Sequence, residues 1–249
     1  MMQHIGKRAM AAMTAVMLSG MAAAQQPSAD GFDAQMKEYG LVDIQSLDAG
    51  ILVELRYSTE DNFVGRDMYG DLEKAYLLPH FARRVVEAQR ILKSRYPDYT
   101  LLIYDAARPI SVQRTMRRMV EGTPNEAFVA DGSRGGRHNY GVAVDLTIAD
   151  SDGRPLDMGT GFDFFGDEAS VKATPDTDDP STRTIDVYRN YIEALARRGA
   201  ISQQAADNRI LLVEVMCEAG LVPYRREWWH FEEVMSMSAT RQKYRLLDF

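Results

Sequence analysis

Residues 136–148 read GRHNYGVAVDLTI, and this stretch decides how the rest of the chain is expected to fold. Its apolar part, from Gly141 to Ile148, predicts a strand. A second apolar run, TLLIY at residues 100–104, predicts a buried strand. Strands and helices do not alternate regularly around these runs, which favours an α+β fold. We therefore expect a single domain in which helices flank a central antiparallel sheet.

Short strands and helices follow one another along the rest of the chain in no regular order, without repeats or long linkers. Apolar residues recur at helical spacing from Pro79 to Arg95, and Pro79 suits the first turn of a helix. Gly220 is a natural end for the last of the long helices. Further helices are expected at residues 109–120, 184–198 and 202–219, further strands at residues 51–55 and 224–234, and an acidic surface loop at residues 174–182.

The composition is that of a folded, acidic protein. The chain of 249 residues is long enough for one large core, and its 45% of hydrophobic residues excludes a wholly disordered protein. The 29 basic and 36 acidic residues give a formal charge of −7, so we expect no nucleic-acid partner. Cys217 is the single cysteine, which excludes an intramolecular disulfide and a zinc site made of several cysteines. Any metal ion must then be held by His, Asp and Glu.

The first 24 residues have the pattern of a secretory signal peptide. Residues 1–8 carry two bases and no acid, and an apolar, alanine-rich run follows and leads to an A-x-A cleavage site before Gln25. The run is too short to span a bilayer. The alternative is a buried N-terminal helix. No cysteine follows the cleavage site, so no membrane anchor is expected, and the mature protein is predicted to be periplasmic or secreted. The expected organisation is a signal peptide at residues 1–24, a polar leader at residues 25–40 and one folded domain at residues 41–249.

Cleavage would leave His80, His138 and His230 as the histidines of the chain, and two of them stand near carboxylates. His138 precedes Asp145 by seven residues, and an imidazole with a carboxylate suits a divalent ion such as zinc. An unbroken strand would direct these two side chains to opposite faces, but Gly141 between them can break the strand. The alternative is an exposed loop histidine with an aspartate that pairs with an arginine. His80 has no comparable surroundings and is expected to be structural.

The second cluster lies in residues 226–232, which read REWWHFE. Glu227 and His230 are three positions apart, so both can face one site only if the chain bends between them. The two tryptophans between them could shield a metal ion from bulk water. The alternative is an aromatic core strand with a hydrogen-bonded core histidine.

Arg108 is a third candidate, at the end of the buried strand that is predicted at residues 100–104. Pro109 fixes the turn after it, so the guanidinium could direct a rigid set of donors at an oxyanion or carboxylate. The alternative is a structural arginine paired with Asp105.

Taken together, these residues resemble a known family. The pattern His-x6-Asp within GVAVDLT, followed by EWWH at residues 227–230, resembles the zinc D-alanyl-D-alanine dipeptidases of the VanX type, within the group of D-Ala-D-Ala peptidases and hedgehog-like domains. RYSTEDNF at residues 56–63, DAARP at residues 105–109 and MGTGFD at residues 158–163 follow the family's order. The likeness runs from about Val42 to Phe231.

The resemblance implies a D-Ala-D-Ala peptidase fold, one zinc ion per chain and a small D,D-dipeptide as substrate. It implies hydrolysis of D-Ala-D-Ala in the turnover of cell-wall dipeptides. By position, it implies that His138, Asp145 and His230 are the zinc ligands, that Glu227 is the catalytic acid and base, that Arg108 stabilises the transition state, and that Asp163 holds the substrate's free amine with Tyr57 nearby.

The chain also departs from the family's pattern. Gly136 stands where the family commonly has a serine that helps to bind the amine, and the acidic loop at residues 174–182 is longer than the family needs. One alternative is a D,D-carboxypeptidase or murein endopeptidase of the same zinc group, although the implied amine pocket at Asp163 speaks against it. The other is a zinc module without activity, against which Glu227 and Arg108 speak.

Overall fold

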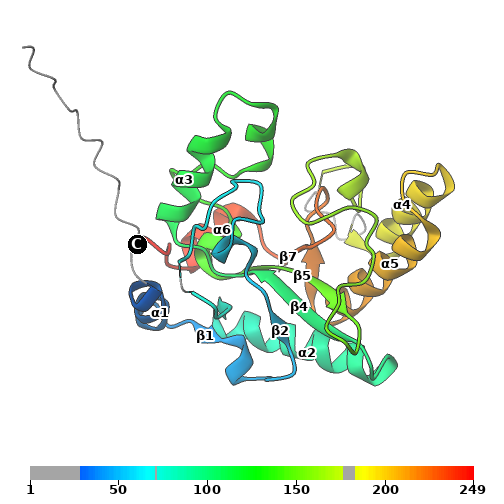
Figure 1. Ribbon diagram of the computed structural model, residues 1–249, viewed down its shortest axis with the longest axis horizontal. Coiled ribbons are helices and arrows are strands. Elements are labelled where there is room, and N and C mark those ends of the chain that lie inside the picture. Colours follow the sequence, from blue (N-terminus) through cyan, green and yellow to red (C-terminus); the bar gives the residue numbers. More distant parts are fainter. Residues whose placement is uncertain (1–28, 71, 176–182) are drawn as a thin grey trace, which may run out of the picture.

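A five-stranded sheet lies at the centre of the computed structural model, which describes residues 29–70, 72–175 and 183–249 (Figure 1). The two longest strands, in its middle, are buried along their whole length. Their apolar sequences therefore form the core, as the runs at residues 100–104 and 141–148 predicted. In spatial order the strands are β2 (Leu52–Val53), β4 (Thr100–Asp105), β5 (Ala143–Ala149), β7 (His230–Glu233) and β6 (Leu221–Pro223).

The sheet is antiparallel at every junction except that of β2 with β4, which is parallel. The chain between these two strands includes a long helix, α2 (Pro79–Arg95), and such a crossover returns it in the same direction. The expectation of a wholly antiparallel sheet is therefore corrected at this edge. The α+β class itself is confirmed.

Helices cover one face of the sheet, where α2 and α5 (Gln203–Glu218) pack side by side and α4 (Ile185–Arg197) lies outside α5 (Figure 1). The helix predicted from Pro79 to Arg95 has these bounds in the structure, because its apolar residues recur on one side. A short antiparallel pair, β1 (Val42–Asp43) with β3 (Tyr76–Leu77), lies apart from the main sheet. The helices are α1 (Ala29–Glu38), α2 (Pro79–Arg95), α3 (Ile110–Val120), α4 (Ile185–Arg197), α5 (Gln203–Glu218) and α6 (Met237–Lys243).

Helix α1 lies within the segment that the sequence suggested as a polar leader. Phe32 and Met36, one turn apart, are buried in the core. Asp33 on the same helix forms ion pairs with Lys37 and Lys74 and also binds a tyrosine of β3. The polar composition of this segment thus conceals an apolar stripe that docks it.

The expected signal peptide at residues 1–24 lies outside the described residues, and so does most of the expected loop at residues 174–182. Across the part of the chain that is described, no helix is long and apolar enough to cross a membrane.

The strand expected at residues 224–234 is wrong in its first half. Residues 224–229 form the connection of a hairpin between β6 and β7, in which the Tyr224 amide donates to the His230 carbonyl and the Glu227 amide donates to Tyr224. Aromatic residues favour strands only where they pack on a sheet, and here Trp228 instead packs against a loop, with its indole bonded to Thr160. The strand expected at residues 51–55 is likewise limited to β2.

Candidate active site

Two neighbouring strands and one short turn bring His138, Asp145 and His230 together. Asp145 and His230 are directly paired across β5 and β7, so their side chains project from the same face of the sheet. His138 lies on the 3-10 turn Arg137–Tyr140, which ends at Gly141 in a left-handed conformation (φ 68°). The glycine redirects the chain into β5. His138 therefore lies outside the strand, and its side chain can reach the same side of the sheet as Asp145 although the two residues are seven positions apart.

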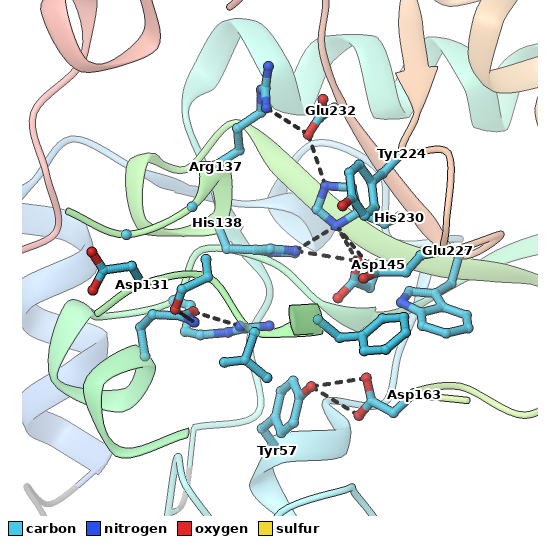
Figure 2. Close-up of a pocket in the computed structure, with 18 of the residues that line it drawn as sticks. Tyr57, Asp131, Arg137, His138, Asp145, Asp163, Tyr224, Glu227, His230 and Glu232 are labelled. Carbon is cyan, nitrogen blue, oxygen red and sulfur yellow. Dashed lines mark hydrogen bonds and ion pairs between the residues drawn. The ribbon is translucent and has the colours of Figure 1, made fainter. Parts of the chain in front are cut away.

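The three side chains each offer one donor atom to a common point (Figure 2). Asp145 Oδ1 lies 3.3 Å from His138 Nε2 and 3.0 Å from His230 Nδ1. The two imidazole nitrogens are 3.1 Å apart. All three donor atoms lie within 4.8 Å of one another, as the ligands of a single ion must.

The surroundings of this group fit a cation. Asp145 Oδ1 is buried and accepts no hydrogen bond from the described residues, so only the two imidazole nitrogens face it. Burial disfavours a charged His230, yet Asp145 and Glu232 outweigh it and raise the pKa of His230 to about 10. The same carboxylates that would retain a proton there would also favour a metal ion.

Both imidazoles are oriented from behind. His138 Nδ1 lies 2.7 Å from the Ala106 carbonyl, which can only accept a hydrogen bond. This contact favours the neutral tautomer with the proton on Nδ1, in which the unprotonated Nε2 faces Asp145. His230 Nε2 lies 3.2 Å from Glu232, which leaves Nδ1 to face the same point. Arg137 pairs with Glu232 at 3.1 Å and holds that carboxylate in place.

A cavity of about 330 Å³ opens beside the cluster and is lined by Glu227, Asp163, Tyr57 and Arg108 as well as by the cluster itself. This volume suits a small ligand. Glu227 Oε2 lies 3.8 Å from His230 Nδ1, because the hairpin connection bends the chain between the two residues. Burial raises the pKa of Glu227 to about 7, which suits a group that must both accept and donate a proton at neutral pH.

Asp163 lies with Tyr57 below the His–Asp cluster as drawn in Figure 2. The Tyr57 hydroxyl donates to both carboxylate oxygens, at 3.2 and 3.0 Å. Burial, and then the charge of Asp145, raise the pKa of Asp163 well above its ordinary value. Asp163 has a φ of 59°, the single positive value among the described non-glycine residues. A partly buried carboxylate with a raised pKa, on a residue in a strained conformation, is typical of a binding site.

Arg108 satisfies both interpretations of the sequence. Its Nε and Nη2 donate to Asp105 and its Nη1 donates to Gln113 at 2.8 Å, so it is tied into the fold. It also lines the cavity, and its guanidinium carbon lies 4.9 Å from the centre of the Tyr57 ring. Tyr69 donates to Asp105 at 2.7 Å and supports the pair. A guanidinium held this rigidly can stabilise charge that develops in the cavity.

The sequence did not identify Glu232, Gln113 and Tyr69 as supporting residues. Glu232 could have been found, since residues two apart on a strand share a face and Glu232 follows His230 by two. Gln113 and Tyr69 carry no local signal. His80 lies outside the cavity and contacts Tyr244 and Glu233, in agreement with a structural role.

The expected residues thus line one small cavity, which combines a group able to hold a metal ion with further carboxylates and an arginine. The chain matches the D-Ala-D-Ala dipeptidase family over residues 37–245, and it belongs to that family.

Relatives of known activity agree with this assignment. The chain is 30% identical to a D-alanyl-D-alanine dipeptidase of Escherichia coli (strain K12) over 192 residues, which cover 77% of this chain and 83% of the relative. It is 28% identical to a D-alanyl-D-alanine dipeptidase of Synechocystis over 61% of this chain and 66% of the relative. For one of Enterococcus faecium the identity is 24%, over 78% of this chain and 91% of the relative. The protein is therefore a dipeptidase with a small substrate, and the resemblance drawn from the motifs is confirmed.

Proposed function

We propose that this protein hydrolyses D-Ala-D-Ala with a zinc ion held by His138, Asp145 and His230. The observation that carries the proposal is that these donors share one cavity with a partly buried carboxylate at Asp163 and a second at Glu227. A free dipeptide presents its ammonium group next to the scissile bond. Within this one cavity, Asp163 can therefore bind the ammonium group while Glu227 transfers protons at the scissile bond.

Two imidazoles and one carboxylate are a ligand set that zinc accepts with a position left open. A zinc ion bound there would supply a Lewis acid for the scissile carbonyl and lower the pKa of a water molecule. Glu232 and the Ala106 carbonyl would keep both imidazoles in the tautomer that ligation requires.

Glu227 would move the proton. Its pKa of about 7 leaves roughly half of these carboxyl groups ionised at neutral pH and therefore able to accept a proton from the attacking water. The same carboxyl would then give that proton to the amine nitrogen of the departing D-alanine. Arg108, which is anchored by Asp105 and Gln113, would stabilise the negative charge on the carbonyl oxygen as the bond breaks.

Asp163 would select the substrate. In the free protein its negative charge is disfavoured by burial and by Asp145, and an incoming ammonium group would remove this penalty. The Tyr57 hydroxyl donates to both oxygens of the carboxylate and fixes its orientation, which would define the position at which the ammonium group binds. Gly136 lines the cavity without a side chain, so Asp163 carries the amine recognition largely without help from that position.

We further propose that the substrate comes from the cell wall and that the protein acts in the periplasm or outside the cell, after cleavage before Gln25. The motif of residues 1–24 supports this placement. The intact mass of the exported protein tests it, and a mass that includes Met1 would refute it.

The decisive experiment compares three substrates on the zinc-loaded protein: D-Ala-D-Ala, N-acetyl-D-Ala-D-Ala and a longer peptide ending in D-Ala-D-Ala. We expect rapid hydrolysis of the free dipeptide alone, and loss of this activity on chelation with recovery when zinc is added. Comparable rates on the free and acetylated dipeptides would refute the dipeptidase and favour the D,D-carboxypeptidase.

A further inference from the structure

The loop that carries Asp163 has little structure of its own. Residues 157–168 pair with no strand of the described sheet. The left-handed conformation of Asp163 therefore gains no support from strand pairing, and side chains from other elements contact the loop instead. Whatever holds this loop determines where the amine-binding carboxylate lies.

Arg209 of α5 supplies contacts on both sides of Asp163. Its Nε donates to the Met158 carbonyl at 2.5 Å, and its Nη1 donates to the Glu168 carbonyl at 2.6 Å. Its Nη2 donates to Thr160 Oγ1 at 3.3 Å. The preceding residue of the helix, Asn208, donates to the loop at the Asp157 carbonyl.

The burial of Arg209 is unusual for a residue with only a packing role. It is 0% exposed, and among the described residues no carboxylate forms a direct ion pair with it, although the charge of Asp157 acts on it from a greater distance. Burial lowers the pKa of Arg209 to about 10, so it still carries its charge at neutral pH. A buried cation without a direct ion pair is costly, and an apolar side chain would pack there at no such cost. Every hydrogen bond that the Arg209 side chain donates to the described residues goes to this loop, so the buried guanidinium serves to hold it.

The same junction reaches the turn that carries Glu227. Trp228 Nε1 donates to Thr160 Oγ1 at 2.9 Å, so Trp228 and Arg209 share one hydroxyl oxygen. The Arg209 guanidinium also lies 5.9 Å from the centre of the Trp228 ring. The neighbour of Trp228 in the chain is Glu227. Arg209 and Thr160 therefore join the loop of Asp163 to the turn of the catalytic glutamate.

We propose that Arg209 is a positioning residue for substrate selection, which sets the separation between Asp163 and Glu227 and thereby requires a free amine beside the scissile bond. This inference rests on the proposed function. A dipeptide fixes the distance from its ammonium group to its carbonyl, so a displaced Asp163 would no longer meet the amine while Glu227 reaches the reacting atoms. Misplacement by about 1 Å is enough to lower a rate on the order of a hundredfold.

Arg209→Lys and Thr160→Val test the inference on the full-length, zinc-loaded protein. Lysine keeps the charge but cannot reach three acceptors in a planar arrangement. We expect the ratio of kcat/KM for D-Ala-D-Ala to that for N-acetyl-D-Ala-D-Ala to fall by roughly 10- to 100-fold, with zinc content unchanged. Thr160→Val removes the shared hydroxyl at nearly constant volume and should lower the same ratio by a few-fold. Hydrogen exchange at residues 157–168 should become faster in both variants.

Leu92→Ala is the matched control, because it removes a buried side chain from α2, outside the cavity lining. It should lower Tm and leave the ratio unchanged. If Arg209→Lys does not fold, Thr160→Val alone decides the question. An unchanged ratio with unchanged exchange in the folded variants overturns the inference. A wild-type protein that hydrolyses no D,D-dipeptide refutes the proposed function instead, and the exchange data then still decide whether Arg209 holds the loop.

Discussion

The charge of Asp163 can be removed with little change in the shape of the side chain. In Asp163→Asn an amide oxygen still accepts the hydrogen bond that Tyr57 now donates at 3.0 Å, so the loop should keep its conformation. The variant would lack the negative charge that we propose as the partner of the substrate's ammonium group. It therefore separates a binding role from a structural one.

The expected loss of activity follows from burial in the complex. Asp163 is partly buried beside Tyr57 at the wall of the cavity, and a bound dipeptide would cover it further, so that solvent would screen the charge pair poorly. Removal of one partner from a buried pair costs about 3–5 kcal/mol, which is roughly 10²- to 10⁴-fold in kcat/KM. N-acetyl-D-Ala-D-Ala has no ammonium group, so its already low kcat/KM should change less than about tenfold.

The stability of the free protein should change in the opposite direction. Because the pKa of Asp163 is raised on folding, its contribution to stability is fully present below the ordinary pKa of 3.8 and is lost as pH rises toward the folded value. Asparagine does not titrate. Asp163→Asn should therefore match the wild type at low pH and exceed it in Tm at neutral pH, when both are measured at equal zinc content.

Steady-state kinetics on both substrates and thermal unfolding across pH check this prediction. Tyr57→Phe is the control, since it removes one hydrogen bond and should cost about 0.5–1.5 kcal/mol, or roughly 2- to 12-fold in kcat/KM. An equal loss on the free and acetylated dipeptides, or a lower Tm for Asp163→Asn at neutral pH, would show that Asp163 is only structural.

Three further predictions concern the other parts of the molecule. Glu227→Ala should retain zinc and lose turnover by roughly 10²- to 10⁴-fold, whereas His230→Ala should lose the metal; equal zinc loss in metal analysis of both would contradict the assigned roles. Arg108→Lys should lower kcat by about 10²- to 10³-fold with little change in KM, because the charge that it stabilises exists in the transition state; an effect on KM alone would count against this. Asp33, whose pKa Lys37 and Tyr76 lower to about 2, should stabilise the fold above pH 4 and cease to do so as pH falls through 2. The difference in unfolding free energy between wild type and Asp33→Asn should shrink over that range, and a difference independent of pH would refute the assignment.

The sequence was most informative where the signal is local. The helix from Pro79 to Arg95 could be predicted to the residue, since its apolar periodicity and its proline act within a few turns. The strands β4 and β5 were found because continuous apolar runs mark strands that are buried on both faces. The aromatic run at residues 224–229 misled the same reasoning, because tryptophan packs equally well in a hairpin connection.

For the site, the chain alone identified the residues with unusual chemistry but could not show that they meet. His138, Asp145 and His230 were recognisable from residue type and motif, whereas their convergence depends on the pairing of β5 with β7 and on the left-handed Gly141. Residues that hold other site residues in place were not recognisable either. Gln113, which accepts a hydrogen bond from Arg108, belongs to no sequence motif.

Arg209 shows the same division most clearly. In the sequence it is one more base on a helix that faces several neighbours, and nothing nearby distinguishes it. Arg209 follows Met158 by 51 positions in the chain, yet in the structure it donates a hydrogen bond to the Met158 carbonyl. Periodicity and motifs report what a residue does within its own turn or strand. Contacts between distant segments depend on how whole elements pack, so only the tertiary structure could assign Arg209 to the loop of Asp163.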